Sequence, residues 1–155
     1  MLELCLRIKN WHREVGEDLH IGVLALQGDY AEHINMLQSN NADVSEIRLP
    51  SQLDDVDGLI IPGGESTTIV QLIDIYDFRT KLVEKASQGF PIWGTCAGMI
   101  VMARELTDYR PEPLNLMNIK VSRNAFGRQI DSFEEDLTIK GIEGKFPAVF
   151  IRAPI

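Results

Sequence analysis

The stretch from Pro91 to Met99, with the sequence PIWGTCAGM, constrains the fold of this chain more than any other stretch. A short apolar run opened by a proline leads into Gly-Thr-Cys-Ala-Gly, and a helical pattern of apolar residues follows. This order predicts a strand, a sharp turn and a helix, with Cys96 in the middle of the turn. Only small neighbouring residues allow a backbone to bend that tightly beside a side chain presented at the end of a strand.

Two interpretations of Cys96 are open on this pattern. At the start of a helix, unpaired N–H groups and the helix dipole favour the thiolate, which is the nucleophilic form of cysteine. A lone cysteine in an ordinary globular chain can also be a small buried apolar residue. Gly-x-Cys-x-Gly alone does not decide between a nucleophile and a packing residue.

The composition excludes several classes of function. A chain of 155 residues, 45% hydrophobic and 25% charged, indicates one globular domain. A net charge of −8 and the lack of a basic stripe argue against a nucleic-acid partner. Cys5 and Cys96 have no metal-ligand spacing, so we expect no metal, no cofactor and no disulfide framework, and a reducing cytoplasm fits best. The sequence has no apolar run of membrane-spanning length, so no membrane partner is expected.

Residues 1–20 show no single periodicity, because their apolar residues fit a strand and a helix equally well. We interpret residues 1–20 as an N-terminal appendage of unknown role and residues 21–155 as the main domain. Cys5 and His12 are interpreted as incidental.

From Ile21 onward, apolar runs typical of buried strands alternate with helical patterns. The runs at 21–26, 44–49 and 58–61 and the run before Cys96 predict four strands. Their order with the helices indicates a doubly wound α/β domain, a mostly parallel sheet flanked by helices, whose ligands bind at the carboxyl ends of the strands. Further short strands are expected near 119–121, 137–139 and 148–151, the last two as antiparallel additions to the sheet.

The first helix is expected to follow Asp29, which would be its N-cap. His33 lies beside the apolar stripe of that helix and is expected to be solvated or to act as a cap. The buried stripe is predicted to consist of Ala31, Ile34, Met36 and Leu37.

The loop Pro62-Gly63-Gly64-Glu65-Ser66-Thr67-Thr68 follows a buried strand. Two adjacent glycines there suit a backbone that comes close to a ligand. The alternative is an ordinary strand-to-helix turn, capped by Ser66 or Thr67.

A cysteine hydrolase needs a thiolate, a base and two N–H donors for the oxyanion. The N–H groups of Ala97 and Gly64 are the candidate donors. For a substrate that carries both an amino group and a carboxylate, Glu65, Arg123 and Arg152 could bind the charged ends. Either arginine can instead belong to a solvated surface ion pair.

Five segments together resemble one known family. Gly94-Thr95-Cys96-Ala97-Gly98 is similar to the nucleophile elbow of the triad-type (class I) glutamine amidotransferases. Within that class, the combination resembles the glutaminase subunit of pyridoxal 5'-phosphate synthase, over Ile21 to Pro154. The other four segments are Leu26-Gln27-Gly28, Pro62 to Thr68, Arg123 to Gln129 and Phe150 to Pro154.

The resemblance implies a flavodoxin-like fold and hydrolysis of L-glutamine to glutamate and ammonia. It also implies a hetero-oligomer in which the ammonia passes to a synthase subunit, which makes pyridoxal 5'-phosphate from ribose 5-phosphate and glyceraldehyde 3-phosphate. Cys96 would be the nucleophile. By motif position, glutamine would be held by Gly64, Glu65, Ser66, Arg123, Ile151 and Arg152.

In this family a Phe-His-Pro-Glu segment near the C-terminus supplies the histidine and glutamate of the triad. The three histidines here, His12, His20 and His33, all precede Cys96. We therefore expect the 155-residue chain to be a C-terminally incomplete form with very low glutaminase activity. Two alternatives are a non-catalytic relative that binds glutamine or the synthase, and a redox-sensing or chaperone-like α/β protein with a reactive Cys96.

Overall fold

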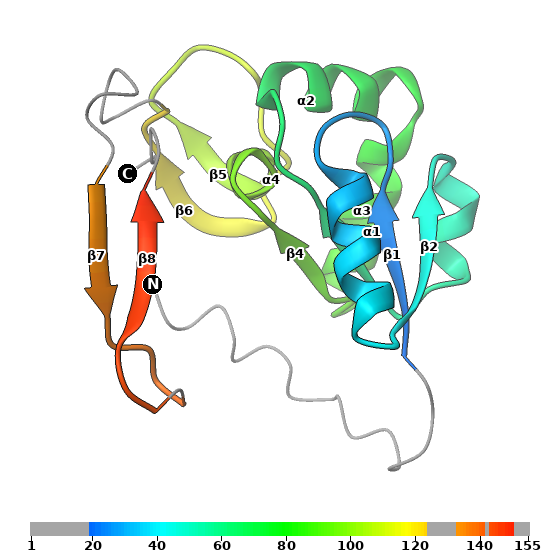
Figure 1. The fold of residues 1–155 in the computed structure, drawn as a ribbon. Coiled ribbons are helices and arrows are strands. Elements are labelled where there is room, and N and C mark those ends of the chain that lie inside the picture. The colour runs from blue at the N-terminus through cyan, green and yellow to red at the C-terminus, as the bar shows by residue number, and fades with distance from the viewer. Residues whose placement is uncertain (1–18, 124–132, 142, 151–155) are drawn as a thin grey trace.

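A computed structural model of the chain describes residues 19–123, 133–141 and 143–150 (Figure 1). The helices in these ranges are α1 (Tyr30–Ser39), α2 (Ser66–Ile75), α3 (Phe78–Ser87), α4 (Ala97–Met102) and the 3-10 helix η2 (Pro50–Asp54). The strands are β1 (His20–Leu24), β2 (Asp43–Ile47), β3 (Gly58–Ile61), β4 (Ile92–Gly94), β5 (Ala103–Leu106), β6 (Met117–Val121), β7 (Phe133–Leu137) and β8 (Phe146–Phe150). None of the helices in the described ranges combines the length and apolar character needed to cross a membrane. Most of the expected appendage, residues 1–18, lies outside the described residues, and His20 already belongs to β1.

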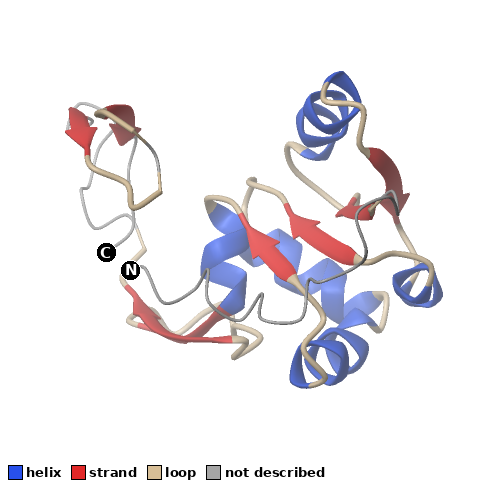
Figure 2. Cartoon of the chain, turned by 90° about the horizontal axis from the view of Figure 1, so that it is seen from below, coloured by secondary structure: helices blue, strands red, loops and turns tan. Residues whose placement is uncertain are grey.

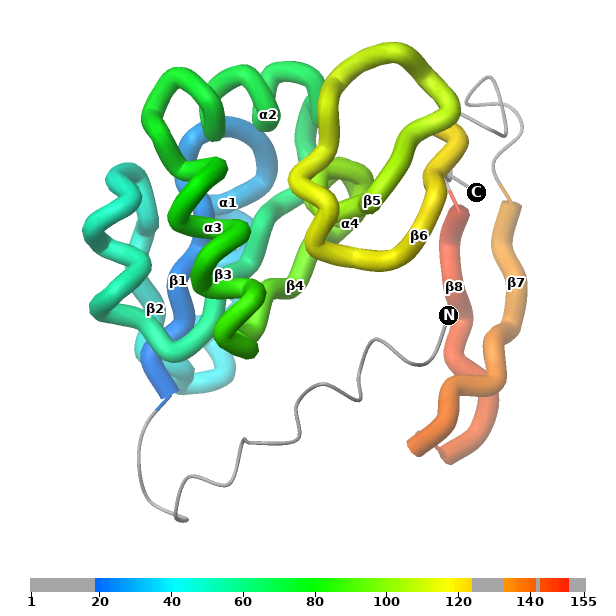
Figure 3. The backbone as a smooth tube through the Cα atoms, turned by 180° about the vertical axis from the view of Figure 1, so that it is seen from behind, coloured from blue at the N-terminus to red at the C-terminus, as the bar shows by residue number. Residues whose placement is uncertain are grey.

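The main sheet contains four parallel strands in the order β2-β1-β3-β4. Every residue of β3 is buried, as a continuous apolar run predicts for a strand covered on both faces. Figures 1 and 3, which view the chain from opposite sides, place α1 on one face of this sheet and α3 on the other, and Figure 2 shows the strands between the helices. The predicted doubly wound α/β fold is therefore confirmed.

The core lies between this sheet and the helices that follow β3. Helices α2, α3 and α4 each contribute side chains to one apolar cluster with the strands. The fully buried members from these helices are Ile69, Ile73, Phe78, Leu82 and Val101. This packing holds the start of α4, and with it Cys96, against the end of β3.

The predicted buried stripe of α1 is wrong, because this helix has no buried residue. Ile34 and Leu37 are half-buried, whereas Ala31 is exposed and Met36 is 65% exposed. The helix rests mainly on β1 and β2, and Met36 is one residue, or about 100°, around the helix from Leu37. That step turns Met36 away from the sheet.

The strands after α4 form two small pairs instead of extending the main sheet. β5 pairs in parallel with β6, and β7 pairs with β8 in an antiparallel hairpin that stands beside the main sheet (Figures 1 and 3). The antiparallel orientation was expected, but the prediction that both strands add to the main sheet is wrong, because they pair with each other. β5 was not predicted, because Arg104 and Glu105 interrupt its apolar pattern. The strand expected at 137–139 lies earlier in the chain, as β7. Its three acidic residues interrupt the apolar pattern and leave the strand almost wholly exposed.

The start of α4 approaches β3 so closely that only glycine fits at position 98. A Cβ on Gly98 would overlap the carbonyl oxygen of Ile61. Helix propensity alone predicts that Gly98→Ala stabilises α4 by up to about 1 kcal/mol. We expect the opposite sign, a loss of roughly 2 kcal/mol or more in the free energy of unfolding, because the backbone of β3 cannot move aside.

Urea denaturation measures this free energy. Gly58→Ala is the matched control, because the nearest atom to a Cβ there is the Pro91 carbonyl oxygen at 3.4 Å, an ordinary contact. A Gly98→Ala variant as stable as the wild type would contradict the close approach of α4 to β3.

Candidate functional site

Loops that follow β1 and β3 meet at the carboxyl edge of the main sheet. β1 and β3 are neighbours, but the chain leaves them for helices on opposite faces, and such a switch point is where α/β proteins bind ligands. The N–H of Asp29 donates to the Gly63 carbonyl over 3.0 Å, and the N–H of Glu65 donates to Gln27 Oε1 over 3.0 Å. These two bonds join the Leu26-Gln27-Gly28 segment to the Gly63-Gly64 loop.

Gly28 makes this junction possible. Its φ is +97°, in the region that favours glycine, and a Cβ there would overlap the Gly63 carbonyl oxygen. A larger residue at position 28 would therefore push the two loops apart.

Cys96 occupies the predicted sharp turn. Its backbone has φ 49° and ψ −111°, an unusual conformation for a residue with a Cβ, which typically costs about 1–3 kcal/mol and persists only where the surroundings hold it. The turn is held by Thr95 N–H to Ile61 O at 3.0 Å and by Gly98 N–H to Thr95 O at 2.8 Å. Cys96 is an exposed free thiol, so the interpretation as a buried packing residue is wrong.

The two candidate oxyanion donors belong to the segments that meet at Cys96, the start of α4 and the glycine loop. Ala97 is the first residue of α4, and a first-turn N–H has no acceptor within its own helix. The Gly63 carbonyl faces Asp29, so in a trans peptide the Gly64 N–H points the opposite way, away from the β1 loop. A Cβ on Gly63 would lie 3.4 Å from Cys96 Cβ, which shows that the glycine loop contacts the nucleophile turn.

Glu65 caps α2, which corrects the prediction that Ser66 or Thr67 does so. Its carboxylate accepts from Thr67 N–H at 3.0 Å, from Thr68 N–H at 2.7 Å and from Thr68 Oγ1 at 2.8 Å. Ser66 lies within the helix and is only 4% exposed. Partial burial raises the pKa of the Glu65 carboxyl, but the hydrogen bonds from Thr67 and Thr68 outweigh it and lower that pKa to about 2.

Arg123 lies beside this carboxylate. Its Nη2 is 3.6 Å from Glu65 Oε1, and its Nη1 donates to the carbonyl of Arg110 at 2.9 Å and to Thr67 Oγ1 at 3.4 Å. The Arg123 side chain is 20% exposed and that of Glu65 is 52% exposed, so Arg123 belongs to a partly solvated ion pair. Ile151 and Arg152, the other expected glutamine-binding residues, lie outside the described residues.

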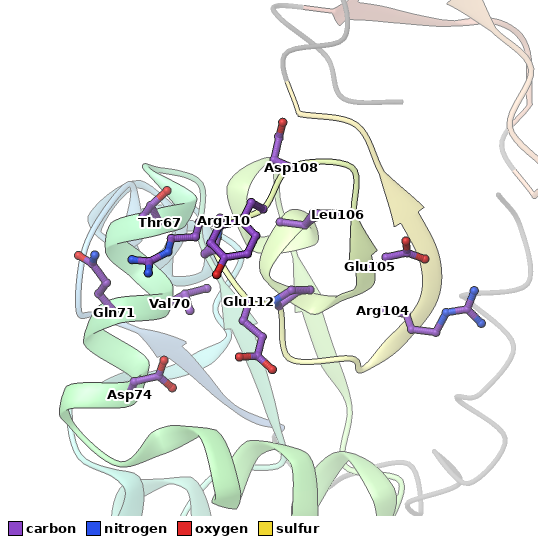
Figure 4. A pocket seen from close by; sticks show the side chains of 13 residues that line it. Thr67, Val70, Gln71, Asp74, Arg104, Glu105, Leu106, Asp108, Arg110 and Glu112 are labelled. Carbon is purple, nitrogen blue, oxygen red and sulfur yellow. The ribbon is translucent and has the colours of Figure 1, made fainter.

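A pocket of about 520 Å³ is lined in part by Thr67 and Arg110, the two residues to which Arg123 Nη1 donates. Figure 4 shows Thr67, Gln71 and Asp74 along α2 on one side and Arg110 and Glu112 on the other. Cys96 is not among its lining residues. The exposed Cys96 thiol therefore lies outside this pocket.

His33 belongs to the site, although the sequence predicted it to be solvated or capping. Its Nε2 lies 2.9 Å from Thr95 Oγ1, and its ring stands edge-on to Trp93 with 6.5 Å between centroids. His33 lies on the half-buried side of α1, in its first turn. Its position four residues before Leu37 and one before Ile34 was the available signal, but nothing local showed that this turn faces Thr95.

A strained cysteine turn at the carboxyl edge of a parallel sheet defines an α/β protein with a nucleophile elbow. The model of the SNO glutamine amidotransferase family matches residues 23–155. The chain belongs to the SNO glutamine amidotransferase family.

Relatives and solved structures agree with this assignment. The pyridoxal 5'-phosphate synthase subunit PdxT of Thermosipho africanus is 49% identical over 136 residues, which cover 88% of this chain and 72% of the relative. The protein of the same name from Bacillus velezensis is 54% identical over 136 residues, which cover 88% of this chain and 69% of that relative. A crystal structure of a glutamine amidotransferase superposes with a TM-score of 0.79 at 44% identity, covering 87% of this chain and 72% of that one. A putative peptidase E protein from Listeria monocytogenes, with a TM-score of 0.57 at 15% identity over 74% and 70% of the chains, shares the fold.

The low pKa of Glu65 predicts how pH changes stability. The folded-state pKa of about 2 is below the ordinary glutamate value of about 4.3, so the cap stabilises the fold fully above about pH 5. This contribution is lost as pH falls from about 4.5 towards 2, because the carboxyl is protonated. We expect Glu65→Gln to lower the free energy of unfolding by about 1 kcal/mol at pH 7, and the two proteins to converge in stability as pH falls to 3.

Urea denaturation at pH 7, 5, 4 and 3 tests this expectation. Glu32→Gln is the control, because Glu32 is an exposed acid in the first turn of α1 and not the cap of that helix. A difference between wild type and Glu65→Gln that stays constant from pH 7 to 3 would show that the carboxylate does not cap α2.

Proposed function

We propose that this chain hydrolyses L-glutamine to L-glutamate and ammonia through a thioester on Cys96. The observation that carries the proposal is the exposed Cys96 thiol on a strained turn, at the edge where the Gly63-Gly64 loop contacts that turn. Family membership supplies the reaction class, and this geometry supplies the reacting group.

The chemistry follows from these groups. The Cys96 thiolate attacks the γ-amide carbon, a C–S bond forms, and the carbonyl π electrons move onto oxygen. The N–H groups of Ala97 and Gly64 are suited to stabilise this oxyanion. When the oxyanion collapses, the C–N bond breaks, the nitrogen takes up a proton, and ammonia leaves a thioester. Water then attacks the thioester, which releases glutamate and restores the thiol.

The charges of Glu65 and Arg123 fit the two charged ends of glutamine. Arg123 is a donor suited to the α-carboxylate, and the low pKa of Glu65 keeps an anion available for the α-ammonium group. Because both Glu65 oxygens already accept from Thr67 and Thr68, the ammonium group would share these oxygens instead of having one to itself. Gly64, Ser66, Ile151 and Arg152 complete the proposed glutamine site by their motif positions.

The proposed destination of the ammonia is a pyridoxal 5'-phosphate synthase subunit, in a hetero-oligomer with this chain. The support is the name of the relatives at 49% and 54% identity, each of which is called a subunit of that synthase. We propose a cytoplasmic location, because a catalytic thiol must remain reduced.

Cys96→Ala tests the nucleophile. We expect it to abolish covalent attachment of the glutamyl group and glutamine-dependent ammonia release, because no other group forms the C–S bond. Intact-mass measurement after acid quenching detects the thioester, and an enzymatic ammonia assay detects turnover. Cys5→Ser is the matched control and should behave as the wild type. Glutamine binding by the wild type without any thioester would replace this proposal with the binding-only relative.

The histidines of residues 1–155 predict a slow reaction for this polypeptide. His20 begins β1, at the far end from Cys96, and its Nε2 is bonded to Ser45 Oγ at 2.8 Å. His33 Nε2 is bonded to Thr95. With no imidazole positioned to protonate the leaving nitrogen among the described residues, we expect ammonia release roughly 10²- to 10⁴-fold slower than in an enzyme with a positioned acid–base group.

The assay compares this polypeptide with a relative, each with the synthase subunit present. Added imidazole should raise the rate of the 155-residue polypeptide, because it can carry a proton to the leaving nitrogen. Turnover close to that of the relative would contradict the prediction.

A further inference from the structure

We propose that His33 is a positioning residue for Cys96, which it holds in its reactive conformation through the side chain of Thr95. The proposal rests on the proposed function only in treating Cys96 as the reacting group. His33 is on α1 and Thr95 directly precedes Cys96, and the two are 62 positions apart in the chain.

Thr95 is anchored at each of its polar groups. Its N–H donates to Ile61 O at 3.0 Å, its carbonyl accepts from Gly98 N–H at 2.8 Å, and its Oγ1 lies 2.9 Å from His33 Nε2. The first two bonds are made by backbone atoms of the β3 end and of α4. The third bond comes from a side chain of another element, His33 on α1.

The strain at Cys96 explains why such anchoring matters. A residue with φ 49° and ψ −111° relaxes unless its neighbours hold both flanking peptides. Thr95 provides the preceding peptide, so movement of Thr95 is transmitted directly to the Cys96 backbone. A hydrogen bond on the Thr95 side chain therefore restrains the direction in which the thiol points.

His33 is itself well placed to act as an anchor. Its N–H donates to the Asp29 carbonyl at 3.3 Å, and its ring is edge-on to Trp93. Asp29 N–H in turn holds the Gly63 carbonyl at 3.0 Å. The start of α1 thus binds the nucleophile turn through His33 and the glycine loop through Asp29, and so it sets the spacing between the thiol and the candidate oxyanion donor.

This geometry assigns His33 a role through Thr95 and not direct proton transfer. The ring nitrogen that faces the turn, Nε2, is already bonded to the Thr95 hydroxyl. His33 is therefore a positioning residue, and its effect should disappear when the Thr95 hydroxyl is absent.

The test is a double-mutant cycle on the rate at which iodoacetamide alkylates Cys96 in the 155-residue chain. Trypsin places Cys96 in the peptide 86–104 and Cys5 in the peptide 1–7, so mass spectrometry follows the two thiols separately. His33→Phe keeps a ring beside Trp93 and removes the nitrogen, and Thr95→Val keeps the shape and removes the hydroxyl. We expect each variant to slow alkylation of Cys96 about fivefold, and the double variant to be no slower than either one, because all three lose the same hydrogen bond.

Two conservative variants provide the matched controls. His33→Gln places an amide group where Nε2 lies, and Thr95→Ser keeps the hydroxyl, so both should react within about twofold of the wild type. Wild-type reactivity in His33→Phe, or single effects that multiply in the double variant, would overturn the proposal. Urea midpoints for all variants separate this role from a merely structural one, which would lower stability without changing the alkylation of the folded protein.

The cycle and the thioester measurement fail independently. Coupling between positions 33 and 95 without any glutamyl thioester would leave His33 as a positioning residue and remove the glutaminase proposal. A glutamyl thioester without coupling between positions 33 and 95 would support the glutaminase proposal and overturn the role of His33.

Discussion

Backbone packs directly against backbone where β1 and β3 end, and the site depends on this contact. Gly28 lies against the carbonyl of Gly63, and Gly98 lies against the carbonyl of Ile61, with no room for a Cβ at either glycine. Because side chains are excluded there, the β1 loop, the glycine loop and the start of α4 come within hydrogen-bond range of one another. The strained conformation of Cys96 is stable only inside this set of contacts.

The charged residues of the site serve the fold and the chemistry together. Glu65 caps α2 with both oxygens, and the same hydrogen bonds keep its carboxyl ionised over the whole neutral range. Arg123 is held between Glu65 and the Arg110 carbonyl, next to the pocket that α2 shares with residues 108–113. A fixed anion next to a fixed cation suits the two charged ends of the proposed substrate.

Elements whose conformation is set by residues close in the sequence could be predicted, and elements that depend on tertiary packing could not. β1 and β3 were predicted because a continuous apolar run is itself the result of burial on both faces. The stripe of α1 was predicted wrongly, because its extent depends on how the helix rests on β1 and β2. The cap of α2 was assigned to Ser66 or Thr67 by residue preference, whereas the bend of the glycine loop turns Glu65 onto the first N–H groups. β5 carries two charged residues and has no strand pattern to find.

The sequence by itself determined the four parallel strands, the sharp turn at Cys96, the glycine loop and, through the combination of five segments, the family. Only the tertiary structure decided that β7 and β8 form a hairpin of their own, that Arg123 lies beside Glu65 and that His33 reaches Thr95. The physical reason is range. Periodicity and turn chemistry act over a few neighbouring residues, whereas a bond between residues 62 positions apart exists only once the order β2-β1-β3-β4 has brought α1 beside the end of β4.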